Sequence, residues 1–403
     1  MELSQLLRRN ISYISDNFTT IINDGEFIYN KSLSEVSFYN VTYIGKSAFA
    51  ECSISKAVFN NAITVEERAF YRCLSLNTIS MDTVMYIGQS AFSGCDNLTT
   101  ISFPSCKYLG SYAFFNCRNL KEVYANSCEV IEFSAFTGCT KLSELYASNC
   151  KYVGAYAFSS CLSLYSIDFP KCLFIGTGAF NACSSLEIVN VPSLTSFEQN
   201  VFVGCSSLKT ISAGECVVIG TQAFMNCNSL QYLDLPNCKI ISGSAFYSCT
   251  SISVISLPKL VYLDQAVFIY CSSLESIDLP SCIHIGANCF LGCTEMSEAI
   301  LPLCLSVRAY AFRSCTHLQK IDLSVCTLIQ GGAFHDCNSL SQLIVRSPMV
   351  CQAEAGFASY TPITNSNYLG YFGSIYVPSY LVSYYKTATN WIAYSDRITS
   401  IIE

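Results

Sequence analysis

The sequence predicts a β-rich solenoid of about 14–15 repeats of 22 residues, in which each repeat packs on the next. The first observation is a fixed period of phenylalanine. Its steps are 22 residues long except one of 21, at Phe27, Phe49, Phe70, Phe92, Phe114, Phe136, Phe158, Phe180, Phe202, Phe224, Phe246, Phe268, Phe290, Phe312 and Phe334. The second is an apolar skeleton, L-x-x-I-x-L-x-x-C, as in Leu164, Ile167, Phe169 and Cys172. A period of about 20–29 residues with this skeleton is typical of a leucine-rich-repeat solenoid.

The composition agrees with a repeat whose inward positions are all apolar. Hydrophobic residues make up 51% of the 403 residues and charged residues only 13%, about half the usual share. The net charge is −7 and no basic stripe is visible, which argues against a nucleic-acid partner. No apolar run approaches the roughly 18 residues that a membrane span needs, so we expect no membrane-spanning segment.

Cysteine supplies the third observation, because 23 of the 25 cysteines fall into two columns with the repeat period. One column is Cys52, Cys73, Cys95, Cys117, Cys139, Cys161, Cys183, Cys205, Cys227, Cys249, Cys271, Cys293, Cys315 and Cys337, and the other is Cys106, Cys128, Cys150, Cys172, Cys216, Cys238, Cys282, Cys304 and Cys326. Leu194 and Leu260 replace cysteine in the second column, so the position requires a small buried hydrophobe. Stacked repeats hold equivalent residues about 4.8 Å apart with parallel Cβ vectors, whereas a disulfide needs converging ones. We therefore predict buried, reduced thiols.

Three segments follow from the repeat: a helical cap over 1–21, the repeats over 22–345 and a closing cap over 346–403. In the first segment apolar residues recur at the spacing of an amphipathic helix, at Leu3, Leu6, Leu7, Ile11 and Ile14. Such a helix would cover the apolar end of the first repeat. Attachment to a larger assembly is the alternative for this helix.

Each repeat is expected to contain one short strand and one shorter extended piece. The alternation of Leu98, Ile101 and Phe103 predicts the strand, and proline often stands at its end. One residue is missing between positions 52 and 70, and we expect it to shorten a loop there rather than the strand. In the closing cap we expect a strand at Ser374–Val377 and a helix at Ser379–Ala388, just after Pro378.

The repeat A-F-x-x-C-x-x-L-x-x-I-x-L-P-x-C-x-x-I-G, as it begins at Ala179 and Ala223, resembles the BspA-type leucine-rich repeat. The resemblance covers about Ile22 to Val345. The segment that contains TPI at 361–363 and GSIYVPSYLVSYYKTATNW at 373–391 is similar to closing segments of such proteins from gut bacteria and tailed phages. The resemblance implies a right-handed curved solenoid, usually at a cell surface, that adheres to host proteins or other cells. No secretory signal or wall anchor is visible, which favours the tail-associated role implied by the phage relatives.

Catalysis is not expected. The three histidines, His284, His317 and His335, do not recur with a nucleophile or with metal ligands, and neither a phosphate loop nor a G-x-S-x-G elbow is present. Cysteines 22 residues apart in linear columns are also unlike a C-x₂-C pair that clamps one metal ion. We predict neither a cofactor nor a metal.

Partner recognition is expected on outward side chains of the strands, which vary because they have no core role. The candidate partner-binding face consists of Tyr124, Tyr146, Asp168, Asn190, Tyr232, Asp234, Asp278 and Asp322. Tyrosine is a good interface anchor. The alternative is a solvated face without a specific partner. A second outward column is more apolar and is either half buried or an exposed ridge: Tyr43, Tyr86, Tyr108, Val130, Tyr152, Phe174, Val218, Ile240, Tyr262 and Leu328.

The sequence thus predicts a non-enzymatic binding protein, a surface or tail-borne adhesin that docks a protein or glycan on its strand face. The first alternative is a phage tail-associated structural or receptor-binding protein, and the second is an intracellular scaffold for protein–protein interaction. Association of copies through the caps is left open, as is a cytoplasmic location.

Overall fold

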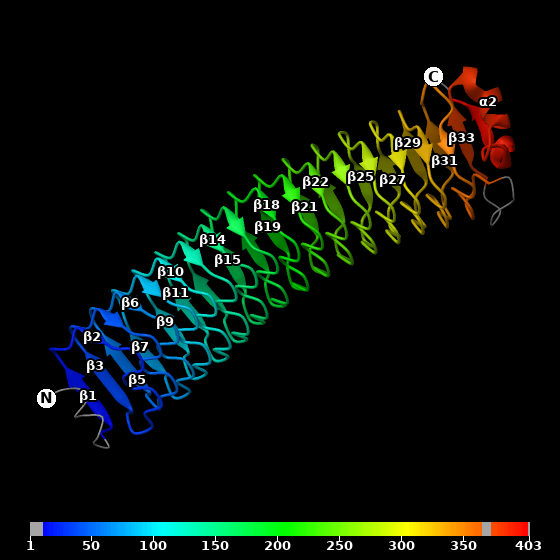
Figure 1. The fold of residues 1–403 in the computed structure, drawn as a ribbon. Helices are drawn as coiled ribbons and strands as arrows, with labels where there is room; N and C mark the ends of the chain where they lie inside the picture. The colour runs from blue at the N-terminus through cyan, green and yellow to red at the C-terminus, as the bar shows by residue number, and fades with distance from the viewer. Residues whose placement is uncertain (1–10, 365–371, 402–403) are drawn as a thin grey trace. The chain divides into compact units, whose positions relative to one another are not determined.

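The computed structural model describes residues 11–364 and 372–401, which form a parallel-strand β-solenoid of about 17 turns. The chain divides into two compact units, whose strands and helix are labelled in Figure 1. The first comprises 1–194 and 204–212, and the second comprises 195–203 and 213–403. Each turn contributes one strand of three or four residues and one of two residues, and the strand pairings of the described residues are parallel.

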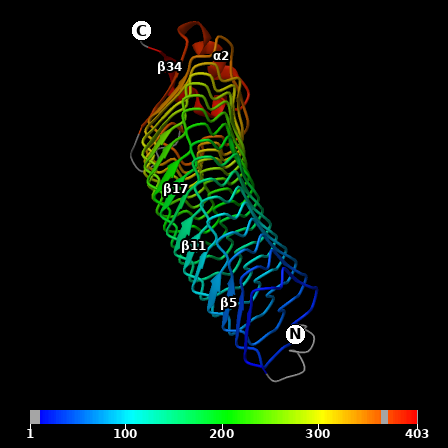
Figure 2. The ribbon, with the colours of Figure 1, turned by 90° about the vertical axis from the view of Figure 1, so that its left-hand side faces the viewer.

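In the first unit the longer strands are β1 (Tyr13–Asp16), β3 (Glu35–Phe38), β5 (Lys56–Phe59), β7 (Thr78–Ser80), β9 (Thr100–Ser102), β11 (Glu122–Tyr124), β13 (Glu144–Tyr146), β15 (Ser166–Asp168), β17 (Ile188–Asn190) and β19 (Thr210–Ser212). The two-residue strands are β2 (Ile21–Ile22), β4 (Tyr43–Ile44), β6 (Thr64–Val65), β8 (Tyr86–Ile87), β10 (Tyr108–Leu109), β12 (Val130–Ile131), β14 (Tyr152–Val153) and β16 (Phe174–Ile175). Figure 2 shows β5, β11 and β17 following one another along one side of this stack.

In the second unit the longer strands are β21 (Tyr232–Asp234), β23 (Val254–Ser256), β25 (Ser276–Asp278), β27 (Glu298–Ile300), β29 (Lys320–Leu323), β31 (Gln342–Val345), β33 (Ser374–Val377) and β34 (Ile398–Ser400). The two-residue strands are β18 (Ser196–Phe197), β20 (Val218–Ile219), β22 (Ile240–Ile241), β24 (Tyr262–Leu263), β26 (His284–Ile285), β28 (Ser306–Val307), β30 (Leu328–Ile329) and β32 (Gln352–Ala353). The helical segments are η1 (Ser379–Leu381), α2 (Val382–Thr387) and η2 (Ile392–Arg397).

The core of each turn is the phenylalanine column, as the period predicts. The Phe158 and Phe180 rings stack with centroids 5.2 Å apart, and both side chains are fully buried. The cysteine columns lie beside them, and all 25 cysteines are free and buried. In the first column the thiol donates to the phenylalanine carbonyl of the preceding repeat, for example Cys161 Sγ to Phe136 O at 3.2 Å. The thiol therefore links adjacent repeats as well as filling the core.

The missing residue shortens a loop, as expected. β5 keeps four residues and full register with β3, from Glu35 opposite Lys56 to Phe38 opposite Phe59. Cys52 and Ile54 are two residues apart, whereas their equivalents Cys73 and Leu76 are three apart, so the deletion lies in the turn before β5.

The predicted helix over 1–21 is wrong in its described part, and residues 1–10 lie outside the described residues. Tyr13–Asp16 is strand β1, which pairs in parallel with β3, and Ile14 lies opposite Val36. The spacing of Ile11 and Ile14 is that of Leu33 and Val36 one repeat later. It is therefore the repeat's own L-x-x-I step, which coincides with helical spacing, and the repeats begin earlier than residue 22.

The repeats also continue past Val345 through one further turn. β32 pairs with β30. Phe334 N donates to Phe357 O at 2.7 Å, and this bond is equivalent to the one from Phe312 N to Ala333 O one turn earlier. Phe357 and Ala358 thus stand in reverse order to Ala333 and Phe334, which hides this turn in the sequence. Beyond it, the strand predicted at Ser374–Val377 is present as β33, and the predicted helix is present as η1 followed by α2.

Candidate binding face

The four candidate residues of the first unit lie on successive strands and point outward. Tyr124 on β11 lies opposite Tyr146 on β13, and Asp168 on β15 lies opposite Asn190 on β17. Their inward neighbours Val123 and Ile167 are buried, because successive side chains of a strand alternate between its two faces. The sequence prediction that these four residues face outward is confirmed, whereas their role in binding stays a prediction.

Tyr124 and Tyr146 form a stacked pair at the surface. Their ring centroids are 4.9 Å apart with an interplanar angle of 6°, and the rings are 36% and 42% exposed. Each hydroxyl donates to the glutamate two residues earlier on its own strand, Tyr124 to Glu122 at 3.3 Å and Tyr146 to Glu144 at 2.7 Å. We call these four residues the tyrosine–glutamate face.

Two carboxylates beside two phenols give this face an acidic character. The pKa of Tyr146 is raised, first by its hydrogen bond to the Glu144 carboxylate and then by the charge of that group. The pKa of Tyr124 is also raised, by desolvation and by Glu122. Both phenols therefore remain neutral hydrogen-bond donors at neutral pH. The next two strands add Asp168, whose Oδ1 accepts a hydrogen bond from Asn190 Nδ2 at 2.7 Å.

The four candidate residues of the second unit are less uniform. Tyr232 and Asp234 are exposed on β21, and Asp278 is exposed on β25. Asp322 on β29 is instead held by Arg346, whose Nη2 lies 3.0 Å from Asp322 Oδ2. Asp322 is thus part of a structural ion pair, and in this unit no stacked tyrosine pair like that of Tyr124 and Tyr146 occurs among the described outward strand residues.

A family model for the BspA type leucine rich repeat region matches the chain in overlapping segments, at residues 9–77, 64–187, 110–231, 217–341 and 284–376. These segments extend beyond 22–345 at both ends, in agreement with the extra turns of the structure. The chain belongs to the BspA-type leucine-rich-repeat family. No curated protein matches it in sequence.

Among solved structures, a similar protein from Bacteroides ovatus shares the fold of this BspA-type chain. A leucine-rich repeat protein from Bacteroides ovatus is 21% identical, with 97% of this chain and 94% of that chain covered and a TM-score of 0.61. A leucine rich cell surface protein from Faecalibacterium prausnitzii is 20% identical, with 85% and 89% covered and a TM-score of 0.38. The pneumococcal vaccine antigen PcpA is 15% identical, with 98% and 95% covered and a TM-score of 0.38.

The second outward column of the BspA-type repeats is intermediate between a half-buried column and an exposed ridge. In the first unit its aromatic members stack in pairs, Tyr86 on Tyr108 at 5.1 Å and Tyr152 on Phe174 at 5.0 Å. Tyr86, Tyr152 and Phe174 are 37–39% exposed, so each ring has one edge in solvent and one against its neighbour. The column is therefore a half-exposed ridge.

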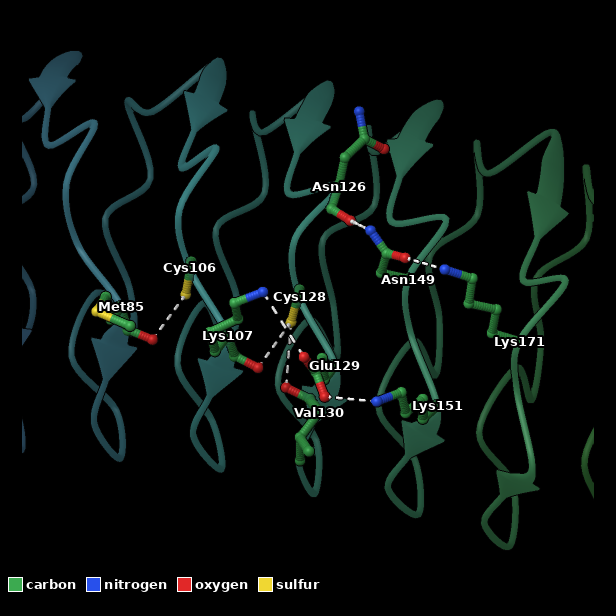
Figure 3. A network of polar contacts seen from close by, with 10 residues as sticks. All are labelled: Met85, Cys106, Lys107, Asn126, Cys128, Glu129, Val130, Asn149, Lys151 and Lys171. Carbon is green, nitrogen blue, oxygen red and sulfur yellow. Dashed lines mark hydrogen bonds and ion pairs between the residues drawn. The ribbon is translucent and has the colours of Figure 1, made fainter.

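Polar ladders run beside this ridge and connect successive repeats (Figure 3). Glu129 lies between two lysines, with Lys151 Nζ at 2.8 Å and Lys107 Nζ at 3.6 Å, and these lysines, Lys151 foremost, lower the pKa of Glu129. Lys171 Nζ donates to Asn149 Oδ1, and Asn149 Nδ2 donates to the Asn126 carbonyl. Since these groups already bind one another, we assign them to the joining of repeats.

The histidines show no catalytic grouping among the residues that the structure describes. His284 Nδ1 lies 3.2 Å from Ser306 Oγ, and His317 Nδ1 lies 2.7 Å from the Thr294 carbonyl oxygen. His335 Nε2 lies 3.4 Å from Asp336 Oδ2. In the same described ranges there is no cluster of three potential metal ligands. Within 11–364 and 372–401, no helix has the length and apolar character needed to cross a bilayer.

One feature of the surface was not predicted. A cavity of about 250 Å³ lies in the first unit, on the turns that follow the phenylalanines rather than on the strands. The sequence signal was the pair Ser93–Gly94, two small residues between the larger pairs Tyr71–Arg72 and Phe115–Asn116. Strand alternation carries no information about these turn positions, so the repeat pattern did not reveal the cavity.

Proposed function

We propose that this chain is a non-enzymatic adhesin that acts at a cell surface, and that the tyrosine–glutamate face docks a basic segment of a partner protein. The family supports the general part of this proposal, because BspA-type repeats are binding scaffolds. The surface location rests on the family resemblance. The observation that carries the specific part is the stacked and hydrogen-bonded pair of Tyr124 and Tyr146.

The physical reason is preorganisation. Tyrosine contributes a large contact area, and here each ring is already fixed by its neighbour and by a glutamate, so binding costs little side-chain entropy. Lysine or arginine of a partner can pair with Glu122 and Glu144. The same cation can lie against the exposed part of the stacked tyrosine rings. Charge complementarity of this kind raises the association rate and selects against acidic partners.

The test uses the full chain and an array of matched peptides that are rich in Lys and Arg, neutral, or rich in Asp and Glu. We expect the basic peptides to bind best and their binding to weaken with added salt. The double variant Tyr124→Ala with Tyr146→Ala should weaken binding about tenfold or more. Tyr262→Ala is the matched control, because Tyr262 is an exposed strand tyrosine outside the candidate partner-binding face.

Two results would overturn the docking proposal: no preference for basic peptides, or equal binding by the double variant and the parent chain when both melt at the same temperature. Cell fractionation with an antibody against the chain tests the location separately. Recovery only in the cytoplasm would contradict surface adhesion and favour the scaffold alternative, and recovery in purified virions would favour the phage alternative.

A further inference from the structure

The cavity on the turns of the first unit has the chemistry of a small-ligand site. It measures about 250 Å³, which corresponds to roughly eight water molecules at about 30 Å³ each. Its lining combines two arginines, Arg72 and Arg118, with the aromatic side chains Tyr71 and Phe115 and with the polar residues Asp96 and Asn116. A site of this size accommodates one ring rather than an extended chain.

The cavity exists because one turn lacks side chains that its neighbours carry. In the repeat that follows Phe92, the two positions after phenylalanine are Ser93 and Gly94, whereas the flanking turns have Tyr71–Arg72 and Phe115–Asn116. The backbone runs through without a break, since Arg72 N donates to Ser93 O and Gly94 N donates to Phe115 O, both at 2.8 Å. The cavity is therefore a gap in a continuous stack of turns.

The backbone conformation does not require this glycine. Gly94 has φ of +73°, but the equivalent Arg72 and Asn116 adopt φ of +52° and +57° with full side chains. A Cβ at Gly94 would lie 3.3 Å from Arg72 Cγ, so a side chain there would crowd the Arg72 side chain, which lines the cavity. Glycine at this position avoids the strain of a side chain at positive φ, and it also leaves the cavity open.

The charges of the cavity favour an anion. Arg118 is engaged, because its Nη1 lies 3.6 Å from Asp96 Oδ2 and its backbone N–H donates to Asp96 Oδ1. Arg72 has neither an ion pair nor a side-chain hydrogen bond with any residue in the described parts of the chain. A guanidinium without a partner beside a cavity is suited to a carboxylate, which it can bind through two parallel hydrogen bonds.

The aromatic residues favour a ring with an apolar face. Tyr71 and Phe115 belong to turns two repeats apart, and at about 4.8 Å per repeat their backbones are separated by roughly 9.6 Å. Both side chains line the cavity, so a ring that occupies it can lie against them. Phe115 is fixed by edge-to-face packing on Tyr112, with centroids 5.6 Å apart.

We propose that this cavity binds an acidic monosaccharide, such as a uronic acid at the end of a glycan. The carboxylate pairs with Arg72, and the ring C–H groups lie against Tyr71 and Phe115. Asp96 accepts hydrogen bonds from the sugar hydroxyls, and the Asn116 amide both accepts and donates them. The polar lining favours a sugar over an aromatic acid, which would offer no hydrogen-bond partner to the Asn116 side chain. This site is independent of the tyrosine–glutamate face, which lies on the strands.

The experiment is saturation-transfer NMR and titration of the full chain with sodium glucuronate, glucose and N-acetyltyrosine. We expect saturation of the glucuronate ring protons and at least tenfold weaker binding of glucose. Arg72→Gln should weaken glucuronate binding about tenfold or more, because it removes a charged hydrogen-bond donor. Arg308→Gln is its control, since Arg308 is an exposed cation of the second unit that does not line the cavity.

Filling the cavity gives the sharpest comparison. Gly94→Asn places there the residue that the next repeat carries at position 116, and it should abolish glucuronate binding. Gly204→Asn is the matched control, because Gly204 has the same φ of +73° and open space for a side chain. It should melt like Gly94→Asn and bind like the parent chain.

Three outcomes would overturn the proposal. One is the absence of saturation transfer to glucuronate in the parent chain. Another is equal binding by Gly94→Asn and Gly204→Asn, which would place the sugar elsewhere. The third is tighter binding of N-acetyltyrosine than of glucuronate with the same dependence on Arg72 and Gly94, which would make this a site for aromatic acids. None of these measurements depends on the peptide array.

Discussion

At the scale of the residue, the chemistry of this chain is dominated by buried thiols. Cysteine fills its column as a small hydrophobe and also donates to a carbonyl, as from Cys172 Sγ to Phe174 O at 3.2 Å in the second column. Leucine at 194 and 260 can replace only the first of these roles. Burial raises the pKa of Cys106 and of Cys183 to about 12, because the thiolate would lose its hydration in the core.

These raised pKa values predict a loss of stability in alkaline solution. Unfolded thiols ionise near pH 9, whereas Cys106 and Cys183 in the folded state hold their protons to about pH 12. Their contribution to stability is therefore fully present below pH 9 and is lost as the pH rises from 9 to 12. Each such thiol lowers the free energy of unfolding by about 1.4 kcal/mol per pH unit in this range. Denaturant titrations from pH 7 to 11 measure it.

The control for this prediction is Cys172→Leu, because leucine stands at the equivalent positions 194 and 260. It removes one ionisable thiol while keeping an apolar side chain in the column. The free energy of unfolding should therefore fall less steeply with pH, by about 1.4 kcal/mol per pH unit, which corresponds to one proton. A free energy of unfolding that stays constant between pH 8 and pH 11 would contradict the account of the cysteine columns.

At the scale of the element, the phenylalanine column is the main apolar contribution of each turn. Phe180→Ala removes a fully buried ring that packs on Phe158 at 5.2 Å and on Phe169 at 6.4 Å. We expect a cavity and a loss of about 3–5 kcal/mol in the free energy of unfolding, measured by chemical denaturation. Phe133→Ala, at a ring that is 37% exposed, should cost much less. Equal effects of the two variants would be inconsistent with the inward column.

Sequence periodicity was sufficient for the inner elements because only one arrangement of the turn buries Phe, Cys and Leu together. It failed at both ends for particular reasons. The step from Ile11 to Ile14 fits a helix as well as a repeat, and only pairing with β3 decides between them. The reversed order of Phe357 and Ala358 broke the pattern, although Phe357 is buried against Trp391.

The sequence likewise predicted one part of the candidate site and not the other. Strand alternation predicted that Tyr124 and Tyr146 face outward, but not that their rings stack or that Glu122 and Glu144 hold their hydroxyls. Those contacts depend on side-chain torsions that one sequence does not determine. The cavity beside Gly94 depends on which side chains the neighbouring turns carry at the two positions after phenylalanine. Only a comparison between turns shows this difference.

At the scale of the whole molecule, each turn contacts only its neighbours, so stability is approximately a sum of repeat and interface contributions. The closing cap of the second unit illustrates how an end is protected. Trp391 is buried, its Nε1 donates to Cys351 O at 2.7 Å, and its ring packs edge to face on Tyr385 at 4.9 Å. Tyr385 OH accepts a hydrogen bond from Cys351 N at 2.8 Å. The cap thus holds the turn that contains β32.

This local connectivity predicts a local response when the cap is damaged. Trp391→Ala should cost about 3–5 kcal/mol in the capping interface and leave the Cys351 carbonyl without its donor. Hydrogen exchange followed by mass spectrometry should show faster exchange at 342–357 and unchanged exchange at 100–190, because distant turns share no contact with the cap. Tyr384→Ala, at a ring that is 63% exposed on α2, is the control and should change neither region. A uniform increase along the whole chain would show instead that the solenoid unfolds as one cooperative unit, and additivity over turns would then not hold.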